Sequence, residues 1–221
     1  DLKKVLSNGK TRGVLGEIQL GNILEEIMSR EQYETNVKTK KGSDAIVEFA
    51  IKLPGKDNND GSVYLPIDAK FPQEDYVRLQ TAYEAGDPIA VEISMKALLQ
   101  AVKKFAKDIS TKYIDPPHTT DFGIMFLPIE GLFAEVVRQP DMIAFLQREY
   151  KIVVTGPTTL AAMLNSLQMG FKTLAIQKRS SEVWNVLASV KKEFNTFGGV
   201  LEKAQKKLNE ANNEIENLVG T

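Results

Sequence analysis

The spacing of hydrophobic and polar residues in the first seventy positions predicts one amphipathic helix followed by three strands. The helix shows apolar residues at helical intervals after a candidate N-cap at Thr11. The second and third strands carry apolar residues at every second position, and a turn-forming Asn58-Asn59-Asp60-Gly61 lies between them, so they are predicted to pair as a hairpin. The first strand alternates weakly and is expected at the sheet edge. The predicted helix spans residues 11–29, and the predicted strands span residues 33–38, 44–53 and 62–69.

The chain up to about residue 178 then alternates predicted helices with two short apolar strands. Pro88 suits the first turn of a helix, and the continuous apolar run FGIMFL is typical of a buried central strand. This order of helices and strands indicates a mixed α/β domain. The predicted helices span residues 73–85, 88–113, 131–137, 142–150 and 156–178, and the strands span residues 122–127 and 151–155.

The last forty residues carry a heptad pattern. From Val183 to Leu218, apolar residues recur at alternating intervals of four and three, which predicts a long helix with a coiled-coil partner or a groove to lie in. Gly198-Gly199 lies inside this stretch and could kink or break the helix. Structural packing is the default interpretation, and self-association as a homo-oligomer is the alternative. We therefore expect an α/β domain over residues 1–178 and a heptad-patterned helix over residues 179–221.

Composition limits the chemistry that the 221 residues can support. The chain has no cysteine, which excludes disulfides, cysteine-ligated zinc and thiol catalysis, and the single histidine, His118, cannot build a multi-histidine metal site. The net charge of −1 gives no overall signature of nucleic-acid binding, although lysine and arginine gather near residues 3–12 and 38–41. No apolar stretch approaches the ~20 residues of a membrane span. We expect a cytoplasmic location, with any membrane anchor upstream of this chain.

One charged cluster is chemically informative. Asp68 and Lys70 are two residues apart at the end of a predicted strand, so their side chains point to the same face. If the hairpin turns near Asp57, Asp44 on the preceding strand lies opposite Lys70 on that face. The other residues that share it are Glu48, Tyr64 and Pro66. Two carboxylates and a lysine form a minimal Mg²⁺-dependent phosphodiester-cleaving site, whereas the alternative is an ordinary charged strand end.

Glu17 is a further candidate, from the first predicted helix. Its neighbours one turn away on the helix are apolar residues and glycines, which predicts that its carboxylate faces inward. An unpaired buried charge is costly, so Glu17 needs a cation, a hydrogen-bond donor or a metal as partner. A buried salt bridge and a metal site both remain open.

Several motifs resemble the conserved domain of the DNA recombination protein RmuC family. They are KTRGVLGEIQL at residues 10–20, LPIDAKFP at 65–72, DFGIMFLPIEGLF at 121–133 and PTTL at 157–160, so the resemblance covers nearly all of the chain. It implies a restriction-endonuclease-like fold of the PD-(D/E)xK superfamily, with a mixed sheet flanked by helices. Family members commonly carry an N-terminal membrane anchor and a long coiled coil before this domain.

The resemblance also implies roles for the charged residues. Asp44 corresponds to the acid of the "PD" element, Asp68 and Lys70 to the "(D/E)xK" element, and Glu17 to the first-helix acid. Ser43 stands where proline often precedes the acid, which removes a backbone constraint but not the chemistry. The metal, Mg²⁺ or alternatively Mn²⁺, would be held by Asp44, Asp68, the Ala69 carbonyl and Glu17.

These observations favour a Mg²⁺-dependent DNA nuclease domain that acts in DNA recombination. Lys70 would orient the attacking water or offset charge that develops on phosphorus. The residues expected to contact the DNA backbone are Lys10, Arg12, Lys40 and Lys41. The alternative is a non-catalytic DNA-binding or scaffolding protein with a nuclease-like fold. A nucleotide-dependent enzyme is disfavoured because no P-loop occurs in the sequence.

Overall fold

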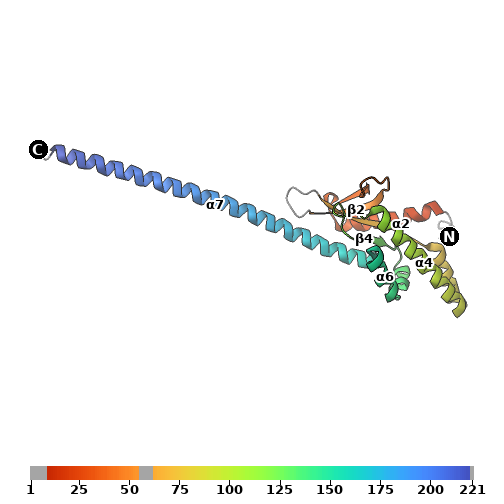
Figure 1. Ribbon diagram of the computed structural model, residues 1–221. Coiled ribbons are helices and arrows are strands. Elements are labelled where there is room, and N and C mark those ends of the chain that lie inside the picture. Colours follow the sequence, from red (N-terminus) through yellow and green to blue (C-terminus); the bar gives the residue numbers. More distant parts are fainter. Residues whose placement is uncertain (1–8, 55–61, 220–221) are drawn as a thin grey trace. The chain divides into compact units, whose positions relative to one another are not determined.

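The protein is a mixed α/β structure with a long C-terminal helix (Figure 1). The computed structural model describes residues 9–54 and 62–219, without the side chains of residues 10–13, 178–182, 212 and 214–219. The contacts divide the chain into two units, Asp1–Gln168 and Met169–Thr221. The described elements are α2 (Gly9–Ile27), η1 (Arg30–Gln32), β1 (Tyr33–Val37), β2 (Val47–Leu53), β3 (Val63–Ala69), α3 (Gln73–Ala85), α4 (Pro88–Tyr113), β4 (Gly123–Phe126), α5 (Glu130–Val137), α6 (Pro140–Tyr150), β5 (Ile152–Thr155) and α7 (Pro157–Val219).

The first unit is built on a five-stranded sheet in the order β1-β2-β3-β4-β5. The first three strands pair antiparallel, and β3, β4 and β5 pair parallel. The parallel pairs need crossover connections, which α3 and α4 provide before β4 and α5 and α6 provide before β5. Because β4 has a neighbour on each side and is buried throughout, its four residues are all hydrophobic or glycine.

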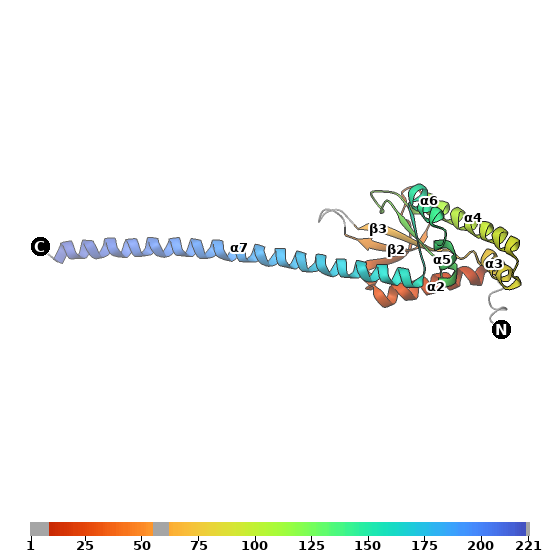
Figure 2. The same cartoon turned by 90° about the horizontal axis from the view of Figure 1, so that it is seen from below.

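Helices cover both faces of this sheet (Figure 2). On one face α2 packs closely: Gly16 approaches the side chain of Ala69 on β3, and Gly21 approaches Phe49 on β2. On the other face α3, α4 and α6 form the main hydrophobic core with residues of β4 and β5. Both faces of β3 are therefore covered, and Asp68 lies on a strand that is buried along most of its length.

Most of the predicted elements are confirmed. The hairpin of β2 and β3, the edge position of β1 and the buried β4 are present, and α3 and α4 have the predicted bounds. Asp87 caps α4, accepting hydrogen bonds from the N–H groups of Ile89 and Ala90 at 3.0 and 3.1 Å. None of the helices within the described ranges is both long enough and apolar enough to cross a bilayer.

Several boundaries differ from the prediction by one to a few residues, and the C-terminal helix is longer than predicted. α2 begins at Gly9 rather than at Thr11, and β2 begins at Val47 rather than at Asp44. The β1–β2 ladder ends at the pair Val37 and Val47, so residues 38–46 form the connection and not a strand. α7 is continuous through Gly198-Gly199, because two glycines cost a long helix only about 2 kcal/mol in total.

Candidate active site

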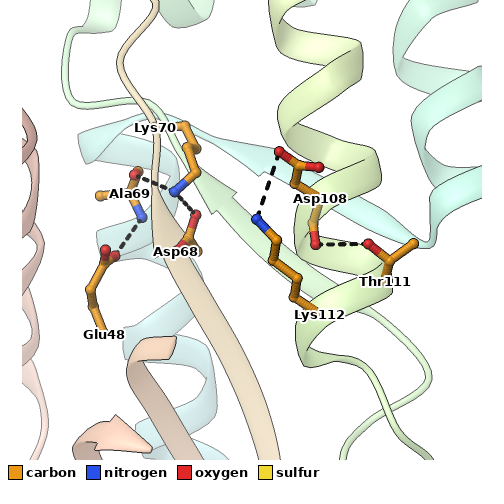
Figure 3. A network of polar contacts seen from close by, with 7 residues as sticks. All are labelled: Glu48, Asp68, Ala69, Lys70, Asp108, Thr111 and Lys112. Carbon is orange, nitrogen blue, oxygen red and sulfur yellow. Dashed lines mark hydrogen bonds and ion pairs between the residues drawn. The ribbon is translucent and has the colours of Figure 1, made fainter. Parts of the chain in front are cut away.

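The triplet Asp68-Ala69-Lys70 lies where β3 ends. The Lys70 N–H donates to the Phe126 carbonyl of β4 at 2.9 Å, which holds the triplet against the centre of the sheet. The Asp68 side chain is fully buried, and its Oδ2 forms an ion pair with Nζ of Lys70, whose side chain is 25% exposed (Figure 3). Lys70 Nζ also donates to the Ala69 carbonyl at 3.4 Å. A buried carboxylate is thus joined to one lysine that reaches solvent.

Glu48 on β2 is the second carboxylate of the cluster. The ladder pairs Phe49 with Ile67, so Glu48 and Asp68 occupy neighbouring positions on the same face of the two strands. Glu48 Oε2 accepts a hydrogen bond from the Ala69 N–H at 3.4 Å (Figure 3). Strand pairing therefore brings two acids and a lysine together from residues that are far apart in the sequence.

The proximity of these groups changes their acidity. Burial, helped by the charge of Asp68 and opposed by Lys70, raises the pKa of Glu48 to about 7. Burial likewise raises the pKa of Asp68, and Lys70 again opposes it. Burial raises the pKa of Tyr113 on α4 to about 12, with contributions from Asp68 and Glu48. Tyr113 therefore stays protonated beside two acids that compete for ionisation.

The Asp68 carboxylate has unused bonding capacity. Neither of its buried oxygens accepts a hydrogen bond of standard geometry from the described residues, and Oδ2 is paired with the charge of Lys70. Buried carboxylate oxygens are normally hydrogen-bonded or bound to a cation. Gln73 at the start of α3 has a similarly unpartnered buried oxygen, Oε1. The cluster is therefore suited to a ligand that supplies positive charge or hydrogen-bond donors.

An open pocket of about 390 Å³ gives access to the cluster. Glu17 of α2 lines it together with Glu48, Ala69 and Lys70, and the charge of Glu17 contributes to the raised pKa of Glu48. The other lining residues are Phe71, Pro72, Gln73, Glu74, Asp75 and Phe105. On the α4 side of the cluster, Lys112 pairs with Asp108 at 3.9 Å (Figure 3).

Asp44 does not belong to this cluster, which corrects the predicted placement opposite Lys70. Its side chain is fully exposed and pairs with Lys38 at 2.8 Å in the β1–β2 connection. The hairpin register pairs residues whose numbers sum to 116, for example Phe49 with Ile67, two more than the predicted 114. Because the register differs from the prediction by an even number, every residue stays on its predicted face of the sheet, but the residue opposite it changes. Glu48, and not Asp44, is therefore the acid of β2 that lies in the cluster, opposite Asp68.

The other predicted site residues have different settings. Glu17 is half-buried at the pocket, which agrees with the expectation that it faces inward. Lys40 Nζ donates to the Thr111 carbonyl at 3.0 Å, whereas Lys41 is exposed and its backbone N–H donates to Asp115 Oδ2 at 3.2 Å. Lys10 and Arg12 lie in the first turns of α2, but their side chains are outside the described residues.

Comparison with known sequences decides the family. The sequence model of the RmuC family matches residues 1–221. The chain belongs to the RmuC family. It is 54% identical over 209 residues to a Xylella fastidiosa protein named "DNA recombination protein RmuC homolog", covering 95% of this chain and 46% of that protein. It is 27% identical over 214 residues to the Escherichia coli K12 "DNA recombination protein RmuC", covering 90% of this chain and 43% of that protein.

This RmuC family chain thus spans about half the length of the curated relatives it matches. A "DNA recombination protein RmuC homolog" of Pseudomonas aeruginosa is 27% identical over 207 residues, covering 89% of this chain and 43% of that protein. No solved structure matches the chain.

The donor atoms of the RmuC family site fit a hard divalent cation. The Asp68 and Glu48 carboxylates and the Ala69 carbonyl are all oxygen donors, and within the described residues the Asp68 oxygens have only the charge of Lys70 beside them and no hydrogen bond of standard geometry. Within residues 9–54 and 62–219, no three His, Cys, Asp or Glu side chains form a ready metal-ligand group. Mg²⁺ is commonly held by one or two carboxylates together with waters and substrate phosphates. Two carboxylates and a carbonyl therefore meet its requirement without a third acid.

Proposed function

We propose that this RmuC family domain is a metal-dependent DNA nuclease of the PD-(D/E)xK type that acts in DNA recombination. The observation that carries the proposal is the meeting of the Glu48 and Asp68 carboxylates with Lys70 beside a solvent-accessible pocket. The curated relatives are named DNA recombination proteins, which supports DNA as the substrate. Two acids and a lysine in this arrangement suit metal-assisted phosphodiester hydrolysis.

Mg²⁺, or alternatively Mn²⁺, would be held by the Asp68 and Glu48 carboxylates and the Ala69 carbonyl. When bound, the cation would polarise the scissile phosphate and make the attacking water more acidic. Glu17 lines the same pocket and would act through the waters around the cation, because its carboxylate adds negative charge without completing a ligand group of three acids.

Lys70 would contact the scissile phosphate and would not be a ligand of the cation. Its Nζ contacts both the Asp68 carboxylate and the Ala69 carbonyl, and its side chain is partly exposed, so it could donate to a phosphate oxygen. A lysine in this position stabilises the negative charge that develops on the phosphoryl oxygens in the transition state.

Glu48 is the best candidate for a proton acceptor in the cluster. Its pKa of about 7 means that it changes protonation state near neutral pH, where an acid–base group works most effectively. A bound cation would favour the ionised form of Glu48 and lower its pKa, so Glu48 would release its proton when the cation binds and act as base only for a water that the cation has made more acidic. The proposal therefore places the nucleophilic water on the Glu48 side of the pocket.

The β1–β2 connection would contact the DNA backbone. Lys38, Lys40 and Lys41 are consecutive or nearly so, and Lys41 is exposed with its side chain free of any described ion pair. Contacts of this kind go to phosphates, so they would be independent of base sequence and sensitive to salt.

The test is cleavage of single-stranded, duplex and hairpin DNA by the purified chain in Mg²⁺, Mn²⁺ or EDTA. Wild type is expected to cut at least one substrate only with a divalent cation, and Lys70→Ala and Asp68→Asn to lose at least 100-fold of that activity. Lys96→Ala is the matched control, because Lys96 forms only an exposed ion pair with Glu92 at 2.7 Å. DNA binding without cleavage under all conditions would favour the non-catalytic scaffold instead.

A further inference from the structure

The C-terminal unit carries a continuous apolar stripe that a single copy of the chain leaves exposed. Every described a and d position of the heptad pattern between residues 183 and 211 is exposed. The large side chains of the stripe are 45–71% exposed, with Phe194 at 71% and Phe197 at 60%. We call these positions the α7 seam; they are Val183, Leu187, Val190, Phe194, Phe197, Leu201, Ala204, Leu208 and Ala211.

The spacing of the α7 seam specifies the shape of its partner. A straight α-helix drifts by about 20° per heptad away from a strict 3.5-residue repeat, so only a partner that winds around it can follow the seam throughout. The seam keeps its alternating intervals of four and three from residue 183 to 211 in one unbroken helix. A long helix with the same heptad repeat meets this requirement.

The surface of α7 is also shaped to receive side chains. A shallow hollow of about 400 Å³ lies between successive turns of the helix, and the residues that line it are Asn185, Val186, Ser189, Val190, Glu193 and Phe194. Two of these residues, Val190 and Phe194, belong to the α7 seam. Val186 and Trp184 flank the seam and are 62% and 71% exposed, which widens the apolar face beyond the a and d positions.

We propose that α7 is the interface of a parallel or antiparallel coiled coil between two or more copies of this chain. The seven large side chains of the seam expose on the order of 700 Å² per copy, close to the roughly 800 Å² per partner of a stable protein interface. Among the described helices, α4 is the next longest, with 26 residues, and its apolar face is already buried in the core of the first unit. A second α7 supplies a seam of the required length and repeat. This proposal does not depend on nuclease activity.

The experiment is the solution mass of the intact 221-residue chain, measured by sedimentation equilibrium between about 1 and 100 µM. Wild type is expected at two or more times the monomer mass of 24.6 kDa, with dissociation on dilution. Phe194→Asp combined with Phe197→Asp is expected to give a monomer, since two charges would enter the seam of each copy. A wild-type chain that is monomeric at 100 µM would overturn the proposal.

A neighbouring pair of substitutions controls for effects on helix formation. Asn195→Asp combined with Thr196→Asp adds the same charge one and two residues away, off the seam, and is expected to keep the wild-type mass. Co-purification of an untagged copy with a tagged one tests the identity of the partner directly. Equal masses for the on-seam and off-seam variants would contradict the seam as the interface, whichever mass they share.

Discussion

Glu48 on β2 accepts a hydrogen bond from the main-chain N–H of Ala69 on β3, with 3.4 Å between Oε2 and the nitrogen. Ala69 is the middle residue of the triplet that also holds Asp68 and Lys70, so this bond fixes the second carboxylate against the first. The bond is made by a backbone donor, which no substitution of Ala69 other than proline removes. Its consequences for acidity, stability and catalysis can each be measured.

Glu48 should make the metal-free protein less stable as the pH rises from about 4.5 to 7. Its pKa is about 7 in the folded protein and near its ordinary value of 4.5 when unfolded, so the folded state binds more protons in this window. The contribution of Glu48 to the free energy of unfolding is fully present below pH 4.5 and is lost as the pH rises through 7. The loss is about 2 kcal/mol after allowance for partial exposure of the side chain. Urea denaturation in EDTA at pH 5 and pH 8 measures the loss.

Glu48→Gln is the control for this pH effect. The amide cannot ionise, so the variant should lose less stability between pH 5 and pH 8 than wild type does. At pH 8, Mg²⁺ should raise the melting temperature of wild type more than that of Glu48→Gln, because a cation stabilises the ionised carboxylate. Identical pH profiles for the two proteins would show that Glu48 is not the titrating group.

Asp44 and Glu48 should differ sharply in their effect on DNA cleavage. Asp44 is fully exposed and its described ion pair is with Lys38, which is also exposed, so Asp44→Ala should retain nearly all activity and change the unfolding free energy by less than about 0.5 kcal/mol. Glu48→Ala should abolish cleavage. Cleavage rates of the two variants at saturating Mg²⁺ decide between them, and a dead Asp44→Ala with an active Glu48→Ala would reverse the assignment.

The difference between Asp44 and Glu48 shows how far the sequence predicts the site. Strand alternation places Asp68 and Lys70 on one face and includes Glu48 on that face, and all of this is observed. Neither alternation nor motif resemblance determines where β2 begins, because that depends on the last pair of the β1–β2 ladder, Val37 with Val47. The difference of two in register followed from the assumption that the hairpin turns symmetrically near Asp57.

The burial of the site is a tertiary property that the sequence does not carry. α3 and α4 were predicted with correct bounds, but nothing in their patterns indicates that Tyr113 lies beside Asp68 and Glu48. Likewise, the sequence shows Gln73 only as a residue in the first turn of a helix, whereas the structure places it at the pocket with a buried Oε1 that accepts no described hydrogen bond. Side chains from separate elements come together only when the elements pack. Hydrophobic periodicity describes each element by itself, so it does not predict these contacts.

Lys70 should be important for stability as well as for catalysis. Lys70→Met would leave the fully buried Asp68 carboxylate without its cation and should lower the unfolding free energy by about 3 kcal/mol at pH 7 in EDTA. Asp68→Asn combined with Lys70→Met removes both charges and should recover much of that loss. Lys52→Met is the control, because the ion pair of Lys52 with Glu34 at 3.3 Å is partly exposed and should contribute less than about 1 kcal/mol.

Gly156, before α7, should not tolerate a side chain. A Cβ there would lie 2.9 Å from Glu130 Oε2 and from the Phe133 ring, and Glu130 Oε1 accepts from the Thr158 N–H at 2.5 Å. Gly156→Ala should therefore destabilise the first unit by about 2 kcal/mol. Gly170→Ala, which meets nothing within 4 Å, should cause no loss, since alanine favours the helix. Thermal melts of the two variants provide the comparison.

Lys41 should contribute to DNA affinity through salt-sensitive phosphate contact. Its side chain is exposed and only its backbone N–H is engaged, with Asp115, so Lys41→Ala removes a charge without breaking a described side-chain contact. The slope of log K against log salt should fall in magnitude by about 0.7 to 0.9, equally for unrelated DNA sequences. Lys40→Ala is a less specific test, because it also removes a hydrogen bond to the Thr111 carbonyl at 3.0 Å.

Fluorescence anisotropy from 50 to 300 mM salt measures the slope, with Lys96→Ala as the charge-matched control. An unchanged slope for Lys41→Ala would exclude the β1–β2 connection from the DNA contact, while leaving the acidic site to be judged by cleavage alone.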